Sequence, residues 1–118
     1  MDNNIFTQAL DQAKNLTLFT SQKQYLLAKF KSNTDVAENG GIFNITAELI
    51  AYVKTMIELG HESIVLLDIN SNPVKIKDSK QFLTKLVDCY SSAINQYHVD
   101  FEKLRQSRTL DQLEYKYD

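Results

Sequence analysis

The sequence predicts a mostly helical α+β fold with one β-hairpin, in which the helices pack around a long C-terminal helix. Three patterns favour this fold class: apolar residues at helical spacing, two apolar segments that flank a polar turn, and a heptad repeat that begins at Leu83. The chain has 118 residues, which suits one compact domain, and 43% of them are hydrophobic, which suffices for a core.

The heptad repeat defines the longest predicted element. Asp78 is placed to accept hydrogen bonds from the free N–H groups of a first helical turn, and Gln81 follows at the spacing of a capping box. A helix from Asp78 to about Arg108 would span roughly 42 Å, which exceeds the width of a compact domain of this size, so its end either projects or is covered by another chain. The residues on its predicted contact stripe are Leu83, Val87, Tyr90, Ile94, Tyr97, Phe101 and Leu104.

The surroundings of this stripe change along the helix. In the first half Leu86 and Ala93 lie beside it and widen the apolar face, as in a helix that packs on a core. In the third heptad Asp100 takes the corresponding position, with His98 and Arg105 on the other flank. There the stripe narrows to a seam typical of contacts between helices of different chains. This pattern predicts a homo-oligomer, most simply a twofold dimer.

The first part of the chain, residues 1–40, is expected to form a helical arm. A first helix is followed by a short second helix from about Ser21 to Phe30, although the segment YLLAKF also fits an edge strand. Residues 32–41 (SNTDVAENGG) are polar and end in two glycines, which predicts a linker. The apolar face of the first helix comprises Phe6, Ala9, Leu10, Ala13 and Leu16.

The remainder, residues 41–118, is predicted to be a module of a helix, a hairpin and the long helix. Asn44 is expected to cap a helix that ends at Gly60. This helix is apolar around most of its circumference, so it is expected to be the most buried helix of the chain.

The hairpin is predicted from two segments, residues 63–69 and 73–77, around the turn Asn70-Ser71-Asn72. The alternation of its second strand places Val74 and Ile76 on one face and Lys75 and Lys77 on the other.

Composition and charge argue against several classes of protein. A formal net charge of −2 provides no field that would attract nucleic acid or an acidic membrane surface. The N-terminal segment MDNNIFTQALDQAKN is acidic and amphipathic, unlike a signal peptide, and no apolar run is long enough to span a bilayer. The single cysteine excludes an internal disulfide. We therefore expect a soluble intracellular protein.

Few residues offer catalytic chemistry. Cys89 and His98 are nine residues apart on one predicted helix, roughly half a turn out of phase at ~100° per residue, so they do not form a nucleophile–base pair. Cys89 fits a small residue beside the core better than a reactive thiol, and His61 fits a capping or surface role better than a metal ligand or general base. No zinc-ligand spacing and no phosphate-binding loop is present. We therefore expect no enzymatic activity, no cofactor and no metal.

The order of the predicted elements after residue 40 is similar to that of a known protein domain. A helix (ITAELIAYVKTMIELG) leads to a hairpin with a polar turn (IVLLDINSNPVKIKD), and a long helix (KQFLTKLVDCYSSAINQYHVDFEKLR) ends in a Thr-Leu-x-x-Leu pattern (TLDQL). Over residues 41–113 this resembles a domain of unknown function found in phage tail-fibre and tail-fibre-assembly proteins. The resemblance implies a phage-encoded, non-enzymatic module that works through protein–protein contacts.

Two classes of function follow from these observations. The first is a structural or tail-assembly protein of a phage particle, whose partners are itself and other phage structural proteins, in the host cytoplasm or incorporated in the virion. The alternative is a small phage-encoded binder that captures a host protein or a nucleotide-like defence signal. Arg105, Arg108, Lys75 and Lys77 are the candidate anion-binding residues of such a binder. Surface ion pairing of the arginines and a solvated strand face for the lysines are the competing interpretations.

Overall fold

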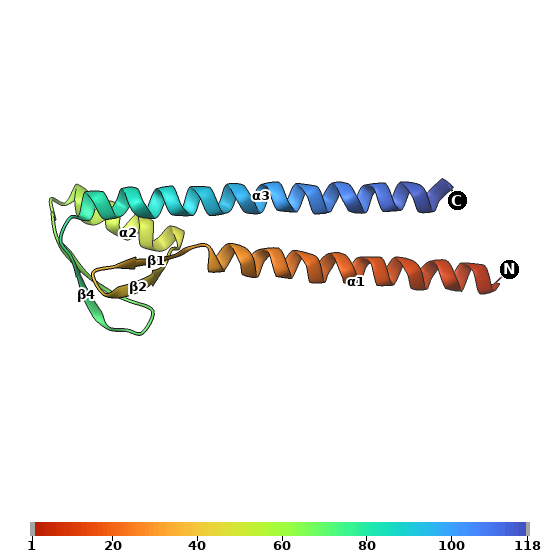
Figure 1. Ribbon diagram of the computed structural model, residues 1–118, viewed down its shortest axis with the longest axis horizontal. Coiled ribbons are helices and arrows are strands. Elements are labelled where there is room, and N and C mark those ends of the chain that lie inside the picture. Colours follow the sequence, from red (N-terminus) through yellow and green to blue (C-terminus); the bar gives the residue numbers. More distant parts are fainter. Residues whose placement is uncertain (1, 118) are drawn as a thin grey trace. The chain divides into compact units, whose positions relative to one another are not determined.

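The computed structural model of the chain describes residues 2–117, and the side chains of residues 4–107. It confirms the mostly helical α+β fold and the long C-terminal helix (Figure 1). The strands form two separate antiparallel hairpins rather than the single predicted one. The elements are α1 (Asp2–Ser32), β1 (Asp35–Glu38), β2 (Gly41–Asn44), α2 (Ala47–Glu58), β3 (Ile64–Leu67), β4 (Pro73–Ile76) and α3 (Ser79–Tyr117).

The chain forms two compact units. Unit 1 consists of residues 1–29 and 97–118, and unit 2 consists of residues 30–96. This division differs from the predicted one at residue 40, because the segment between residues 30 and 40 belongs with the hairpins. α1 and α3 each contribute to both units.

Unit 2 contains the hydrophobic core. Every strand buries alternate residues, so each hairpin turns one face inward. The Phe43 ring of β2 meets the Phe82 ring of α3 edge to face, with centroids 5.6 Å apart. The buried cluster is formed by Val36, Phe43, Ile45, Val53, Ile64, Leu66, Val74, Ile76, Phe82 and Leu86.

The first hairpin corrects the predicted linker at residues 32–41. Asn39 and Gly40 both have positive φ angles, 47° and 85°, and Glu38 pairs with Gly41, so the hairpin closes with a two-residue turn. Asn-Gly is a strong short-range signal for such a turn. The linker prediction was wrong because it relied on polar composition. A polar segment can still form these strands, because each strand has to bury only one face. The buried hydrophobic residues on that face are Val36 of β1 and Phe43 of β2.

The second hairpin, β3 and β4, is the one predicted from residues 63–69 and 73–77, and the structure confirms it. β3 pairs with β4 in antiparallel register, with Ile64 opposite Ile76. The Asp68 carboxylate accepts hydrogen bonds from the N–H groups of Asn70 and Asn72, both at 2.9 Å, and thereby closes the turn. The faces of β4 are as expected: Val74 and Ile76 are buried, and Lys75 and Lys77 are exposed.

The helix α2 begins two residues later than predicted. Thr46, not Asn44, is its N-cap, and the Thr46 hydroxyl accepts from the Leu49 N–H at 3.1 Å. Gly60 has φ 90° and ends the helix with bonds typical of a Schellman motif, as predicted. The expectation that this is the most buried helix was wrong. Val53 is the one fully buried residue of α2, whereas α3 buries Phe82, Leu86 and Ala93. Four further apolar residues of α2 are partly buried against the core: Leu49, Ile50, Met56 and Ile57.

The N-terminal segment forms one helix where two were predicted, and the edge-strand alternative for YLLAKF was wrong. The hydroxyl groups of Thr17 and Thr20 donate to the carbonyls of Ala13 and Leu16, at 2.9 and 3.0 Å, as they do inside a helix. No glycine or proline interrupts the segment, so the helix continues past Ser21 instead of restarting there.

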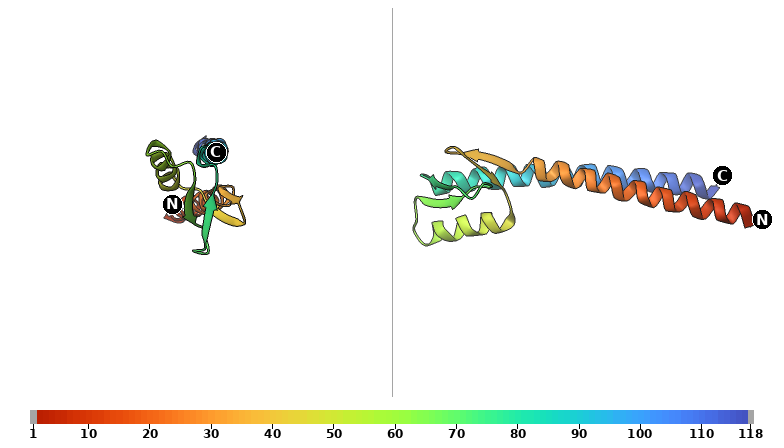
Figure 2. Two further views of the ribbon diagram at one scale, coloured as in Figure 1. Left: turned by 90° about the vertical axis from the view of Figure 1, so that its left-hand side faces the viewer. Right: turned by 90° about the horizontal axis from the view of Figure 1, so that it is seen from below.

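The long helix α3 begins as predicted. The Asp78 carboxylate accepts from the Gln81 N–H at 3.1 Å, and the helix continues beyond Arg108 to Tyr117. In unit 1 the C-terminal part of α3 lies beside α1 and runs in the opposite direction, which Figure 2 shows from below. None of the helices, over the residues that the structure describes, combines the length and apolar character needed to cross a membrane.

Candidate interaction surfaces

The predicted contact stripe of α3 has different surroundings in the two units. In unit 2 the residues of α3 that enter the core are Phe82, Leu86 and Ala93. Val87 and Ile94, which belong to the predicted stripe, are exposed. The buried face therefore lies one residue earlier in the sequence, about 100° around the helix.

Leu83 and Tyr90, also on the predicted stripe, are partly buried at the edge of the core. The Tyr90 ring meets the Phe30 ring edge to face at 5.8 Å. The exposed Val87 and Ile94 thus remain available for a contact with another chain, and that contact stays a prediction.

In unit 1 the stripe faces α1 of the same chain. Tyr97, Phe101 and Leu104 are partly buried. The Phe101 ring lies 6.3 Å from the Phe19 ring and stacks on Tyr97 at 6.1 Å. The intrachain partner of the predicted seam is therefore α1, and a contact of these residues with a second chain remains a prediction.

α1 carries two separate apolar faces. Phe19, Leu26 and Phe30 are partly buried and recur at spacings of seven and four residues. None of the side chains between residues 4 and 32 is buried. The spacing of Phe19, Leu26 and Phe30 was present in the sequence, but the more continuous apolar face nearer the N-terminus obscured it.

That second face is the one predicted from the sequence, and it is exposed. Phe6 is 66% exposed and Leu16 is 53% exposed, and Ala9, Leu10 and Ala13 between them are exposed as well. At ~100° per residue its centre lies roughly 120° around α1 from the face that contacts α3. The larger apolar face of α1 is therefore not the one that its own chain covers.

The candidate anion-binding residues do not form one cluster within either unit. Arg105 lies in unit 1, 3.9 Å from the carboxylate of Glu102 one turn earlier, an arrangement that matches surface ion pairing. Arg108 lies outside the described side chains. Lys75 and Lys77 lie in unit 2 and are exposed. Anion binding by these residues stays a prediction.

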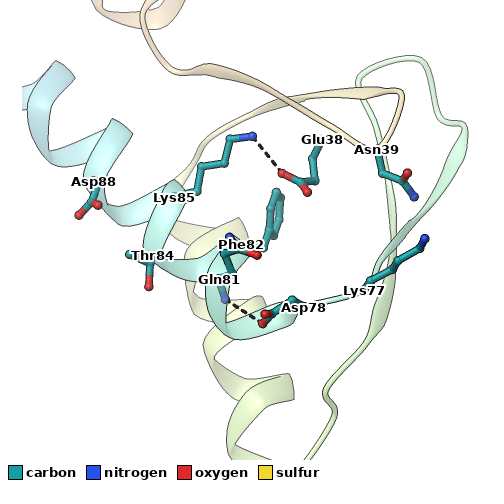
Figure 3. Close-up of a pocket in the computed structure, with 9 residues that line it drawn as sticks. All are labelled: Glu38, Asn39, Lys77, Asp78, Gln81, Phe82, Thr84, Lys85 and Asp88. Atoms are coloured by element: carbon teal, nitrogen blue, oxygen red, sulfur yellow. Dashed lines mark hydrogen bonds and ion pairs between the residues drawn. The ribbon is translucent and has the colours of Figure 1, made fainter.

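Unit 2 has an open pocket of about 630 Å³ beside the first turns of α3 (Figure 3). The Lys85 ammonium at its wall donates to the Glu38 carboxylate at 2.9 Å and to the Ala37 carbonyl at 2.6 Å. Asp78 caps α3, and Asp88 adds a further negative charge. Lys85, Glu38 and Asp78 are thus engaged in bonds that hold the fold, whereas Lys77, one of the candidate anion-binding residues, also lines the pocket.

The remaining reactive side chains are also separate. The Cys89 thiol is partly buried and donates to the Asn33 carbonyl at 3.4 Å. His61 follows the end of α2 and its backbone N–H bonds to the Met56 carbonyl, while His98 is exposed on α3. Over the described residues, no three histidine, cysteine or carboxylate side chains are grouped as a metal site would require.

Among the described side chains, the exposed apolar residues Phe6, Leu10 and Leu16 of α1 and Val87 and Ile94 of α3 are thus the candidates for contact with another chain. Comparison of the chain with family models, with curated proteins and with solved structures finds no match.

Proposed function

We propose that this protein is a non-enzymatic assembly protein, a structural or tail-assembly component of a phage particle, that works through protein–protein contacts and associates with itself. The observation that carries the proposal is the exposed apolar face of α1. The phage context is supported by the resemblance of residues 41–113 to domains of tail-fibre and tail-fibre-assembly proteins.

The energetic argument starts from the side chains on that face. Phe6 and Leu16 are more than half exposed in the single chain. Full burial of a Phe or Leu side chain contributes roughly 1.5–3 kcal/mol, so a partner that covers the face gains on the order of 1 kcal/mol from each. Contiguous apolar surface of this kind is typical of interaction sites.

A second copy of the chain fits this face. In a twofold antiparallel contact centred near Asp11, Phe6 of one copy lies beside Leu16 of the other, and Ala9 lies beside Ala13. Large residues then meet large residues at both ends, and the two alanines let the helices approach closely between them. Such a self-complementary arrangement is what an isologous dimer requires.

The test compares two leucines of the same helix. Leu16 and Leu18 are 53% and 57% exposed, but they lie roughly 160° apart around α1 at ~100° per residue. We expect Phe6→Ala together with Leu16→Ala to lower the average mass of the assembly in light scattering and sedimentation at tens of micromolar. Phe6→Ala together with Leu18→Ala removes as much exposed apolar surface and should weaken association less.

Alanine preserves the helix, so circular dichroism should be unchanged in both variants. A wild type that is strictly monomeric at hundreds of micromolar would exclude self-association. Mass spectrometry of purified particles tests the phage context separately, since a structural component must be present in the particle or in its assembly intermediates.

A further inference from the structure

The edges of the two hairpins differ in how their backbone groups are satisfied. In an antiparallel pair, alternate residues direct their N–H and C=O groups toward the partner strand, and the others direct them outward. Outward groups form a template on which another strand can pair, so proteins commonly cover such an edge or place charged side chains along it.

In three of the four strands, one outward carbonyl accepts a hydrogen bond from another part of unit 2. On β1 the Ala37 carbonyl accepts from the Lys85 ammonium at 2.6 Å. On β2 the Ile42 carbonyl accepts from the Ile69 N–H at 2.9 Å. On β4 the Lys75 carbonyl accepts from the Asn39 side chain at 2.8 Å. Each of these edges is therefore engaged within unit 2.

β3 is the exception. The Asp68 N–H bonds across the hairpin to the Asn72 carbonyl, and the Ile69 N–H, two residues beyond the end of β3, bonds away from the hairpin to the Ile42 carbonyl of β2. The odd-numbered residues of this segment therefore direct their backbone groups outward, and the part of this edge that is open is confined to β3 itself. Val65 and Leu67 are the outward residues within β3. Among the described residues, nothing bonds to their N–H or C=O groups.

The side chains of the same two residues are open to solvent. Val65 is 59% exposed and Leu67 is 66% exposed, while Ile64 and Leu66 between them are buried. The strand has no lysine, no proline and no bulge of the kinds that protect an edge. An open edge with apolar side chains favours the addition of a strand from another chain.

We infer that β3 pairs with β3 of a second copy, antiparallel about a twofold axis at Leu66, and so joins two hairpins into one four-stranded sheet. In this register Val65 lies opposite Leu67 of the second copy, and Leu67 lies opposite its Val65. Both members of each pair have outward backbone groups, so they exchange both N–H···O bonds. Leu66 faces Leu66 at the axis, where the backbone groups of each copy already bond to β4.

A second copy fits this edge because the strand is self-complementary. Its outward donors and acceptors occur at two residues placed symmetrically about Leu66, and its four residues carry no charge. A charged residue in β3 would lie close to its own copy across the twofold axis and would oppose pairing. The exposed Val65 and Leu67 form apolar cross-strand pairs on one face of the joined sheet.

Amide hydrogen exchange measured residue by residue tests this pairing separately from any contact through α1. We expect exchange at Val65 and Leu67 to slow by at least about tenfold as the protein is raised from low micromolar to hundreds of micromolar concentration. Val65→Lys should abolish this dependence. Leu67→Pro should do the same, since it removes an outward N–H and no bond to β4.

Two controls accompany these variants. Val65→Thr keeps a β-branched, uncharged residue and should retain the concentration dependence. Tyr52→Lys introduces the same charge at an exposed apolar position of α2 and should retain it too. Exchange rates at Val65 and Leu67 that do not change with concentration would overturn the inference. Protection that survives Val65→Lys in a folded protein would overturn it as well, even if α1 still mediates association.

Discussion

The side chain of Asn39, in the turn of the first hairpin, donates a hydrogen bond of 2.8 Å to the main-chain carbonyl of Lys75 on the edge of the second hairpin. The bond joins two elements that share no strand pairing. It also occupies a carbonyl that an edge strand would otherwise present to other chains.

Asn39 therefore has two roles that substitutions can separate. Asn39→Gly keeps the positive φ of 47° accessible and removes only the hydrogen bond, so it should lower the free energy of unfolding by roughly 0.5–1.5 kcal/mol. Asn39→Ala also forces a residue with a Cβ into the left-handed region and should cost about 1 kcal/mol more. Urea denaturation measures both values, and equal losses in the two variants would show that the backbone conformation adds nothing.

Gly41 is expected to be intolerant of a side chain. A Cβ at this position would lie 2.6 Å from Cγ2 of the buried Val74, so Gly41→Ala should destabilise unit 2 by about 1–3 kcal/mol through overpacking. Val74→Ala removes the obstructing methyl group and leaves a small cavity. In a double-mutant cycle the two changes together should cost less than the sum of the separate changes. If the two costs add, the backbone at residue 41 must move to accommodate the new Cβ. The contact between that Cβ and the Val74 methyl group would then not be the cause of the destabilisation.

If the protein is a small binder that uses Arg105 and Arg108, it should have an anionic ligand. An assembly protein requires no such ligand. We expect a thermal-shift screen with cyclic nucleotides, ADP-ribose derivatives and short oligonucleotides to give no saturable stabilisation. Exposed ion pairs such as Arg105–Glu102 contribute only about 0–1 kcal/mol, so Arg105→Gln with Arg108→Gln should change stability little. A stabilisation of several degrees that disappears in this double variant would favour the binder over the assembly protein.

The single cysteine and the two histidines are not expected to be required for function. Cys89→Ser, His61→Ala and His98→Ala should each preserve assembly, with stability losses of roughly 0.5–3 kcal/mol, the usual range for single substitutions. Cys89→Ser should lie at the upper end of the three, because the thiol is partly buried and bonds to Asn33, whereas both histidines are exposed. Loss of function in any of these variants while folding and assembly stay normal would contradict the non-enzymatic proposal.

The two proposed surfaces together predict the size of the assembly. The α1 face and the β3 edge each form a twofold contact, so a chain that uses both links more than two copies. Sedimentation at high concentration should show species larger than a dimer for the wild type. A variant that carries only Val65→Lys should form dimers and nothing larger. The same holds for a variant that carries only Phe6→Ala and Leu16→Ala. The variant with all three substitutions should be monomeric. A wild type that stops at the dimer would mean that only one of the surfaces is used.

The sequence by itself determined the features that depend on neighbouring residues. Asp78 caps α3, Gly60 ends α2 in the left-handed conformation, and the Asn70-Ser71-Asn72 turn joins β3 and β4. Each of these is governed by hydrogen bonds or backbone angles within a few residues, so a local pattern is sufficient to predict it. The Asn39-Gly40 turn belongs to the same group, since its signal was present in the sequence and only composition argued against it.

Tertiary structure decided which apolar faces are covered. α3 has two overlapping apolar stripes, and packing in unit 2 buries Leu86 and Ala93 while it leaves Val87 and Ile94 exposed. α1 likewise turns Phe19 toward α3 and leaves the face that carries Phe6 in solvent. Burial of an apolar side chain depends on what stands opposite it, and contacts between distant segments such as Phe19 and Phe101 set that partner. Periodicity along one helix carries no information about such contacts.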